Sequence, residues 1–219
     1  MVTVAVIDSG IASGHPHVGV VSRGILIGTD FESGDFADRI GHGTAVAAAI
    51  IEKAPDIELI AVRVFEKELA TSAAVLARGI TWAGHNGARL INLSLGTPNL
   101  ARESILRSAV DDAASRGAIV VSAAEVDGVA YLPGSLPGVI GVMLDWDCPR
   151  DDVRIVDGRV HASGFPRPIP GISPERNLSG ISFAVANATG VLARILGSAT
   201  EVGTVAVALQ LLRERERGS

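Results

Sequence analysis

The chain alternates short apolar, β-branched runs with longer segments of helical pattern, and this alternation limits its fold more than any other feature. The runs resemble strands that are buried on both faces, and they lie at residues 2–7, 58–64, 89–93, 118–122 and 138–143. The helical segments cover residues 44–53, 72–86 and 100–116, each followed by an Ala-Pro pair or a glycine. Such alternation produces parallel strands joined by right-handed crossovers. The sequence therefore predicts an α/β fold, a doubly wound and mainly parallel sheet with helices on both faces.

The composition is that of one globular domain covering residues 1–219. The 219 residues include 47% hydrophobic residues and 25 glycines, which is enough to bury a core of ordinary size. The formal net charge is −5, and Lys and Arg are spread along the chain, so we expect no nucleic-acid partner. The single cysteine, Cys148, excludes an intramolecular disulfide and lacks the paired spacing of zinc sites.

The apolar runs are all short of a membrane span. None approaches the roughly 18 residues that a membrane-spanning helix needs, so we expect no membrane partner. The N-terminal run VTVAVI leads directly to Asp8, without the basic region and apolar stretch of a secretory signal. We therefore expect a cytoplasmic protein.

Three short segments carry the residue types of a nucleophilic serine site. Asp8 lies in VAVIDSG, His42 in GHGTAVAAAI and Ser182 in GISFAVANATG. A serine nucleophile needs an imidazole to take its proton, and a buried carboxylate to hold that imidazole in the correct tautomer. The order Asp, His, Ser along the chain is one of the three known for this constellation. His42 and Ser182 each stand just before an apolar helical segment, where free N–H groups favour developing negative charge.

These segments and two others resemble blocks of the subtilisin-like serine peptidases. VAVIDSGIASGHP is similar to the aspartate block of that family, GHGTAVA to its histidine block and GISFA to its serine block. INLSLG at 91–96 resembles its substrate-binding strand, and GAIVVSAA at 117–124 the strand that leads to its oxyanion asparagine. The five blocks occur in family order. The resemblance implies a subtilisin-like fold in which Asp8, His42 and Ser182 form a catalytic triad that cleaves peptides through an acyl-enzyme intermediate.

Each of these residues also has a purely structural interpretation. Asp8 followed by Ser-Gly is typical of an Asx turn that closes a strand. His42 alone could be a histidine at a helix start, and Ser182 alone a helix cap. Their joint occurrence in family order favours the catalytic interpretation. His15 and His17 have no cluster of carboxylates or cysteines beside them, so we expect a solvated loop there, with no metal site and no cofactor.

The resemblance implies that a peptide or protein substrate binds as an added strand, with backbone hydrogen bonds giving affinity and pockets giving selectivity. The substrate-binding segment is Leu93, Ser94, Leu95 and Gly96, and the wall of the principal pocket is Ala123, Ala124 and Glu125. Gly96 suits close backbone approach, although Gly-Thr-Pro is also a strand-terminating turn. A carboxylate at Glu125 inside the pocket would select a substrate Lys or Arg. A shifted alignment would instead place Glu125 in a loop that faces solvent.

The sequence departs from the family at the oxyanion site. An ungapped alignment puts Val126 at the position of the asparagine whose amide donates to the oxyanion, and valine cannot donate. Ile181 replaces the threonine that usually precedes the serine. The backbone N–H of Ser182 is the remaining recognisable donor, and Asn177 or Asn187 is a candidate replacement for the missing one. The loss of an oxyanion donor predicts a slow enzyme.

Three functions are compatible with these observations. The first is a cytoplasmic serine endopeptidase that processes one or few peptides slowly and specifically. The second is a degenerate, slow or inactive scaffold that keeps the triad and binds peptides or a partner. The third is an acyl transferase that passes the acyl group from Ser182 to an amine. A nucleotide-binding domain is set aside because the chain has no GxGxxG or GxxxxGK motif.

An acidic run precedes the histidine segment and does not predict a calcium site. It lacks the alternating ligand spacing and the glycine of a dedicated calcium loop. We expect a solvated loop there, or an acidic rim that attracts basic peptides. The residues of this run are Asp30, Glu32, Asp35 and Asp38.

Overall fold

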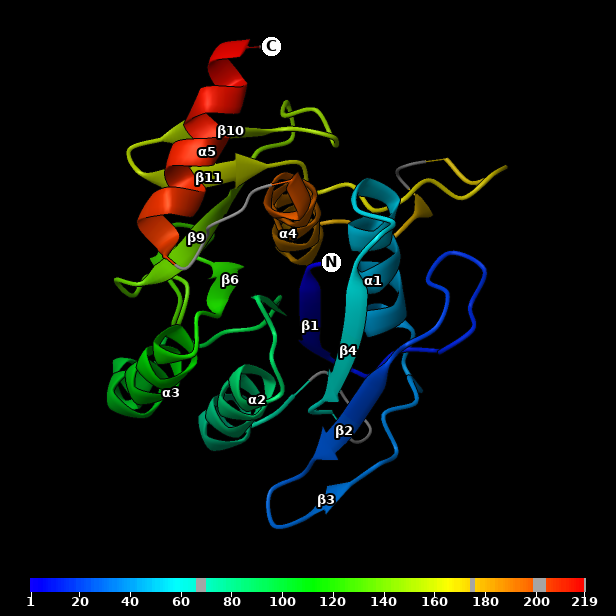
Figure 1. Ribbon diagram of the computed structural model, residues 1–219, viewed down its shortest axis with the longest axis vertical. Helices are drawn as coiled ribbons and strands as arrows, with labels where there is room; N and C mark the ends of the chain where they lie inside the picture. The colour runs from blue at the N-terminus through cyan, green and yellow to red at the C-terminus, as the bar shows by residue number, and fades with distance from the viewer. Residues whose placement is uncertain (66–69, 174–175, 199–203, 219) are drawn as a thin grey trace.

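The computed structural model describes residues 1–65, 70–173, 176–198 and 204–218, and a nine-stranded sheet forms its centre (Figure 1). The strands of this sheet are β1 (Thr3–Asp8), β2 (Arg23–Ile27), β3 (Glu32–Ser33), β4 (Glu58–Arg63), β5 (Leu90–Leu93), β6 (Ile119–Ala123), β9 (Val139–Leu144), β10 (Val153–Val156) and β11 (Arg159–Ala162). They lie in the order β10-β11-β9-β6-β5-β1-β4-β2-β3. A separate hairpin pairs β7 (Glu125–Val126) with β8 (Val129–Ala130).

The strand order reverses beside β1. This strand pairs in parallel with β4 on one side and with β5 on the other. Parallel pairing continues outward through β2 on the first side and through β6, β9 and β11 on the second. The outermost pairs, β2 with β3 and β10 with β11, are antiparallel. The carboxyl ends of β1 and β5 therefore meet at a topological switch point, the usual place of a site in an open α/β sheet.

Helices cover both faces of the sheet. α1 (His42–Lys53) and α4 (Ile181–Ser198) lie on one face, and α2 (Ala73–His85) and α3 (Glu103–Ser115) on the other (Figure 1). A short 3₁₀ helix, η1 (Leu100–Arg102), leads into α3, and α5 (Val205–Gly218) packs against α4 and β10.

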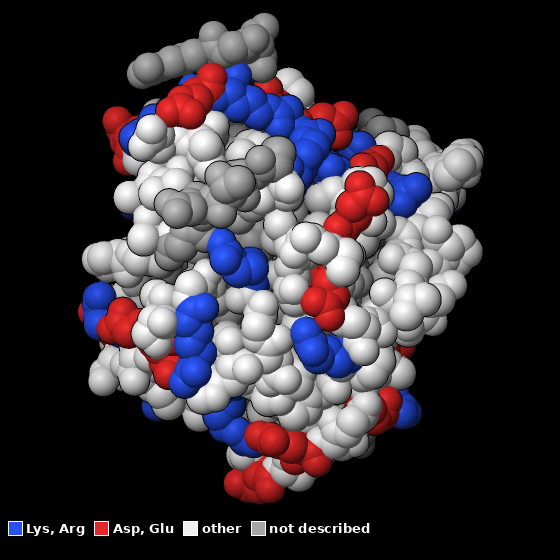
Figure 2. Space-filling model, viewed as in Figure 1, with Lys and Arg blue, Asp and Glu red and all other residues white. Residues whose placement is uncertain are grey.

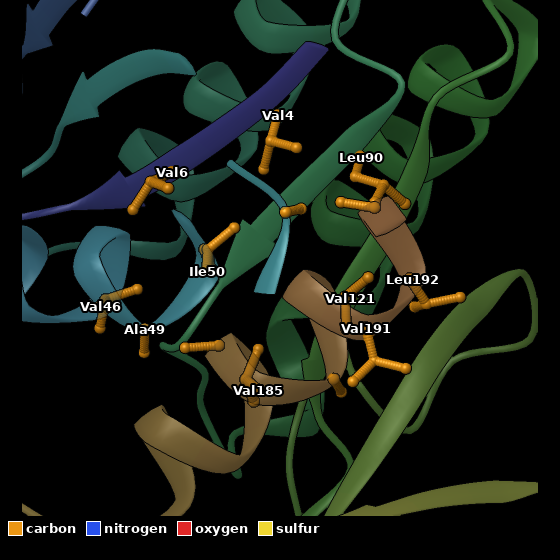
Figure 3. Packing of buried hydrophobic residues seen from close by; sticks show 14 of the residues in the cluster. Val4, Val6, Val46, Ala49, Ile50, Leu90, Val121, Val185, Val191 and Leu192 are labelled. Atoms are coloured by element: carbon orange, nitrogen blue, oxygen red, sulfur yellow. The ribbon is translucent and has the colours of Figure 1, made fainter. Parts of the chain in front are cut away.

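Each face of the sheet has its own apolar core, because successive strand residues point to opposite sides. Val4 and Val6 of β1 join the core under α1 and α4, whereas Ala5 and Ile7 join the core under α2 and α3. Figure 3 shows the first of these cores, in which side chains of both helices meet those of the strands. Its helical members include Val46, Ala49, Ile50, Val185, Val191 and Leu192. Burial on both faces explains why the central strands are continuously apolar.

A glycine lets α1 and α4 approach closely. A Cβ atom at Gly190 of α4 would lie 3.0 Å from the carbonyl oxygen of Ile50 and 3.1 Å from Cβ of Lys53, both in α1. These distances are shorter than ordinary van der Waals contacts between such atoms. The two helices therefore pack at a separation that a larger residue at this position would increase.

The predicted fold class is confirmed, since the sheet is mainly parallel and carries helices on both faces. The predicted strands and helices all occur, with ends that differ by at most three residues. The prediction that His42 and Ser182 precede their helices was wrong by a small margin. His42 is the first residue of α1 and Ser182 the second of α4, because the glycines before them, Gly41 and Gly180, adopt positive φ and end the loops there.

The lengths of the helices and the surface charges are relevant to what the molecule contacts. Within the described residues, no helix is both long and apolar enough to cross a membrane. Figure 2 shows acidic and basic side chains interspersed over the face in view.

Candidate active site

The carboxyl end of β1 and the start of α1 bring Asp8 and His42 into contact. One carboxylate oxygen of Asp8, Oδ1, lies 2.8 Å from Nδ1 of His42 and accepts a hydrogen bond from the backbone N–H of Ser9 at 2.7 Å. The side chain of Asp8 is fully buried, and that of His42 is 14% exposed. A carboxylate on Nδ1 keeps the hydrogen of a neutral imidazole on that nitrogen, so Nε2 is left as the base.

Glycines make this contact possible. A Cβ atom at Gly43 would overlap the carbonyl oxygen of Gly10 and would lie 3.1 Å from Cβ of Asp8. Gly41 caps α1 with a φ of 96°, in the left-handed region that favours glycine. Gly43 is therefore required by the approach of α1 to the end of β1, and Gly41 by the left-handed conformation of the residue before His42.

Asp38 holds the start of α1, a role that the sequence analysis missed. Its carboxylate accepts hydrogen bonds from two backbone N–H groups of the loop before His42, at 2.8 and 2.9 Å, and from the N–H and hydroxyl of Thr44, at 2.9 and 2.6 Å. It also accepts from the hydroxyl of Ser9, whose oxygen accepts from the N–H of Gly43. An aspartate a few residues before an apolar helix is a known N-terminal signal, so the sequence did contain this information.

Two carboxylates raise the pKa of His42. Burial disfavours the charged imidazolium, but the hydrogen bond and charge of Asp8, together with the charge of Asp38, favour it more strongly. The pKa of His42 is therefore above its ordinary value. For Asp38 itself, burial raises the pKa, but the hydrogen bonds from Thr44 and the neighbouring backbone outweigh it and lower the pKa. Asp38 thus stays ionised beside an imidazole that is ready to accept a proton.

Ser182 lies at the same edge of the sheet, in the first turn of α4. Its hydroxyl donates to the carbonyl oxygen of Ser94 at 3.5 Å, and its own carbonyl accepts from the hydroxyl of Ser94 at 3.1 Å. The ring of the next residue, Phe183, lies 6.0 Å from that of His42, measured between centroids. Ser182 is therefore held against the segment that follows β5, and its neighbour in α4 packs beside the imidazole.

A buried polar network fixes the start of α4 against β5. The amide of Asn92 donates to Oγ of Ser94 at 3.1 Å, and the hydroxyl of Thr189 lies 3.0 Å from the amide oxygen of Asn92. Asn92 and Thr189 are fully buried, and Ser94 is nearly so. Because Ser94 also contacts Ser182, these bonds connect a central strand to the candidate nucleophile.

The two segments predicted to bind substrate lie at the ends of neighbouring parallel strands. Leu93 ends β5 and Ala123 ends β6. Beyond Gly96, Thr97 and Leu132 each donate a backbone hydrogen bond to the carbonyl oxygen of the other, both 2.9 Å long. Ser94 and Ala124 are buried, whereas Leu95 and Gly96 are half-buried. The two segments are adjacent, and their role in peptide binding stays a prediction.

Glu125 and Val126 form β7, the first strand of a tight hairpin. Its turn consists of Asp127 and Gly128, both with positive φ, as in a type I′ turn. The carboxylate of Glu125 lies 3.5 Å from Nη1 of Arg159 on β11, so it already has a cationic partner. Val126 is half-buried and packs against the core under α1 and α4.

Both asparagines proposed as replacement oxyanion donors are bonded to loop carbonyls, Asn187 through both of its amide hydrogens and Asn177 through one. The amide of Asn187 donates to the carbonyl oxygens of Ser163 and Phe165, at 2.7 and 2.9 Å. The amide of Asn177 donates to the carbonyl oxygen of Arg167 at 3.3 Å, and its oxygen accepts from the next backbone N–H. Both side chains are used to hold the loops before α4. As the second residue of α4, Ser182 has a backbone N–H with no acceptor inside the helix.

The expected solvated acidic loop is correct for Asp30 and Glu32, which are exposed, and for Asp35, whose side chain is 41% exposed. Glu32 pairs with Arg78 at 2.6 Å, and Asp35 pairs with Arg39 and Arg63 at 2.8 and 3.3 Å. The expectation is wrong for Asp38, which is bonded to α1 as described above. The sequence does not reveal these partners, because they come close only in the folded chain. Within the described residues, no three His, Cys, Asp or Glu side chains are grouped so that they could hold a metal ion.

Comparisons with known proteins agree on one family. The subtilase family profile matches residues 1–144. Subtilisin Savinase of Lederbergia lenta is 31% identical over 201 residues, which cover 87% of this chain and 71% of that protein. An alkaline protease of Alkalihalobacillus alcalophilus is 31% identical over 87% of this chain, but over only 50% of its own length, so the chain spans about half of such relatives. A solved protease structure from Pseudoalteromonas arctica superposes with a TM-score of 0.76 at 21% identity, covering 97% of this chain and 82% of that one.

Proposed function

Since the chain belongs to the subtilase family, we propose that it is a serine endopeptidase in which Asp8, His42 and Ser182 form the catalytic triad. The observation that carries the proposal is the 2.8 Å contact between buried Asp8 and Nδ1 of His42, at the end of the strand β1. Ser182 is bonded to Ser94, just beyond the end of the neighbouring strand β5. The contact between Asp8 and His42 leaves Nε2 of the imidazole as the only basic nitrogen.

The proposed reaction is an acyl transfer to water. His42 takes the hydroxyl proton of Ser182 as its oxygen attacks the scissile carbonyl, and it later gives this proton to the leaving amine. Asp8 holds the imidazole and stabilises the imidazolium. The backbone N–H of Ser182 would donate to the oxyanion. Water then attacks the acyl-enzyme and releases the second product.

We propose slow, specific processing of one or few peptides, because the oxyanion site has one recognisable donor. The loss of one such donor lowers kcat by about 10²- to 10³-fold. Val126 packs against the core, and the amides of Asn177 and Asn187 are bonded elsewhere, which supports this proposal. A peptide would bind as an added strand beside Leu93–Gly96. The cytoplasmic location of the protein stays a prediction.

Labelling with a fluorescent phosphonate tests this function. We expect slow, stoichiometric labelling of the wild type and none of Ser182→Ala. We also expect a loss of labelling in His42→Ala, because the serine then lacks its base. Ser135→Ala is the matched control and should label like the wild type. Absence of labelling in a folded wild type would refute the endopeptidase.

The second candidate is a degenerate scaffold that binds peptides without turnover, which the depleted oxyanion site also favours. Peptide binding to the wild type without labelling of Ser182 would select it. An acyl transferase would label normally but would give an amide product when an amine is added to the peptide reaction. Mass spectrometry of the products distinguishes it from a hydrolase.

A further inference from the structure

A cavity of about 360 Å³ lies beside α1. Its walls come from the loop after β1, the loop before α1, α1 itself and the loop before α4. None of the residues that line it belongs to the segments Leu93–Gly96 or Ala123–Val126. It is therefore distinct from the groove implied by the family resemblance.

Basic side chains converge on this cavity from two of its walls. His15 and His17 line it from the loop after β1, with their ring centroids 5.4 Å apart, and Arg167 lines it from the loop before α4. Nδ1 of His15 accepts a hydrogen bond from the backbone of His17, so a neutral His15 carries its hydrogen on Nε2 and is a donor there.

Arg167 is a half-buried cation that has no anionic partner among the described residues. Its Nη1 donates to the carbonyl oxygen of His17 at 3.2 Å, which ties the two loops together. Among the described residues, no carboxylate lies within ion-pair distance of its guanidinium. A guanidinium has five donors in a planar fork, and a single carbonyl leaves most of them free.

Asp38 is the carboxylate that lines the same cavity, but it is committed to α1. Both of its oxygens accept hydrogen bonds from the backbone, Ser9 and Thr44, so it does not pair with Arg167. The donors left for a ligand include those of Arg167 and the two histidines. A guanidinium binds a carboxylate through two parallel N–H groups, so a carboxylate is the ligand that these basic side chains favour.

The cavity begins next to the catalytic imidazole. Gly41, which lines it, precedes His42, and Ala45, which also lines it, lies one turn further along α1. Because His42 gives its proton to the leaving amine, the part of a peptide that follows the scissile bond must lie on the side of this imidazole. We propose that the cavity binds a carboxylate in that part of the substrate. This inference rests on the proposed function, and it adds a substrate class that the function does not require.

Selection from peptide pools tests the proposal without turnover. Immobilised Ser182→Ala protein is incubated with three peptide pools that share the same randomised core. The first pool has acidic side chains and an amidated C-terminus, and the second has neutral side chains and a free C-terminus. The third has neutral side chains and an amidated C-terminus, so it carries no carboxylate. We expect about tenfold enrichment of a carboxylate-bearing pool over the last one. The enriched pool shows whether the carboxylate is a side chain or a C-terminus.

Further substitutions, added to Ser182→Ala, show whether the cavity causes the enrichment. Adding Arg167→Gln should abolish the enrichment, and Arg167→Lys should retain part of it. Arg89→Gln is the control, because Arg89 is exposed at the opposite edge of the sheet, before β5. Equal recovery of all pools, or an enrichment that persists in a folded Arg167→Gln protein, would overturn the proposal. Failure of phosphonate labelling would instead count against the proposed function, since this selection needs no catalysis.

Discussion

Two carboxylates, those of buried Asp8 and half-buried Asp38, act differently on the imidazole of His42. Asp8 contacts Nδ1 directly, whereas Asp38 acts through its charge and through the hydrogen bonds that hold the first turn of α1. Both favour the imidazolium over the neutral ring. The base of the proposed reaction is the neutral ring, so activity must fall as the pH drops through the raised pKa of His42.

Asp38→Asn is expected to move the acid limb of the kcat/KM profile to lower pH. Removal of the negative charge lowers the pKa of His42, so the neutral base persists further into acid. A pH series with one good peptide measures the limb. Asp30→Asn makes the same change of charge at an exposed residue and should leave the limb in place. An acid limb that stays fixed in Asp38→Asn would show that Asp38 has only a structural role.

Gly43→Ala should destabilise the protein and reduce turnover together. The new methyl group would overlap the carbonyl oxygen of Gly10, so α1 must move away from β1. Overpacking of this kind costs about 1–3 kcal/mol, which urea unfolding will detect. Gly34→Ala is the control, since a Cβ there has nothing within 4 Å and no positive φ. Wild-type stability and rate in Gly43→Ala would mean that the Asp8–His42 contact tolerates a wider spacing.

At the scale of elements, the start of α4 depends on a strand of the sheet interior. Asn92 of β5 is bonded to Ser94 and Thr189, and Ser94 contacts Ser182 on both its carbonyl and its hydroxyl. Asparagine inside a buried strand is costly unless its amide is fully bonded. Here the cost is offset by a fixed relation between β5 and α4.

Asn92→Leu should therefore cost about 1–3 kcal/mol of stability, because it leaves Ser94 and Thr189 without their buried partner. We also expect a lower kcat in the folded fraction, since Ser182 loses its support. Chemical unfolding and steady-state kinetics on the same preparation give both values. Asn86→Ala removes a hydrogen bond to Trp82 at the far end of α2 and should lower stability alone. If kcat per folded molecule is unchanged in Asn92→Leu, the network does not position the nucleophile.

The strands and helices that the sequence predicted are those with strong periodicity and clear ends. The missed strands are short and lie at the sides of the sheet or outside it: β2 and β3 at one side, β10 and β11 at the other, and the β7–β8 hairpin. Asp127-Gly128 is the turn signal of that hairpin. The hairpin was not predicted, because this segment was interpreted by its resemblance to a loop of the family. Asp38 was missed for a related reason, because it was grouped with its acidic neighbours instead of with the helix that follows.

At the scale of the whole molecule, the ordered sequence blocks predicted the family and the doubly wound sheet, and the comparisons confirm the family. They did not predict which charges pair across the fold. Glu125 was expected either in a selective pocket or in a loop that faces solvent, and neither alternative included its partner Arg159, 34 residues away in the chain. Arg167 was not singled out at all, and its place beside His15 and His17 arises only when three loops meet. Partners that depend on long-range packing cannot be predicted from local pattern.

Gly190 connects this packing to the rate of reaction. His42 and Ser182 stand at the starts of two helices, and the separation of those helices is determined where Gly190 meets Ile50 and Lys53, about 12 Å along α4 from the serine. Any residue along this line of contact can thus alter turnover without touching the substrate. Substitutions at these positions would affect both the stability of the fold and the rate of the proposed reaction. Variants of altered rate should therefore be sought along the whole contact between α1 and α4.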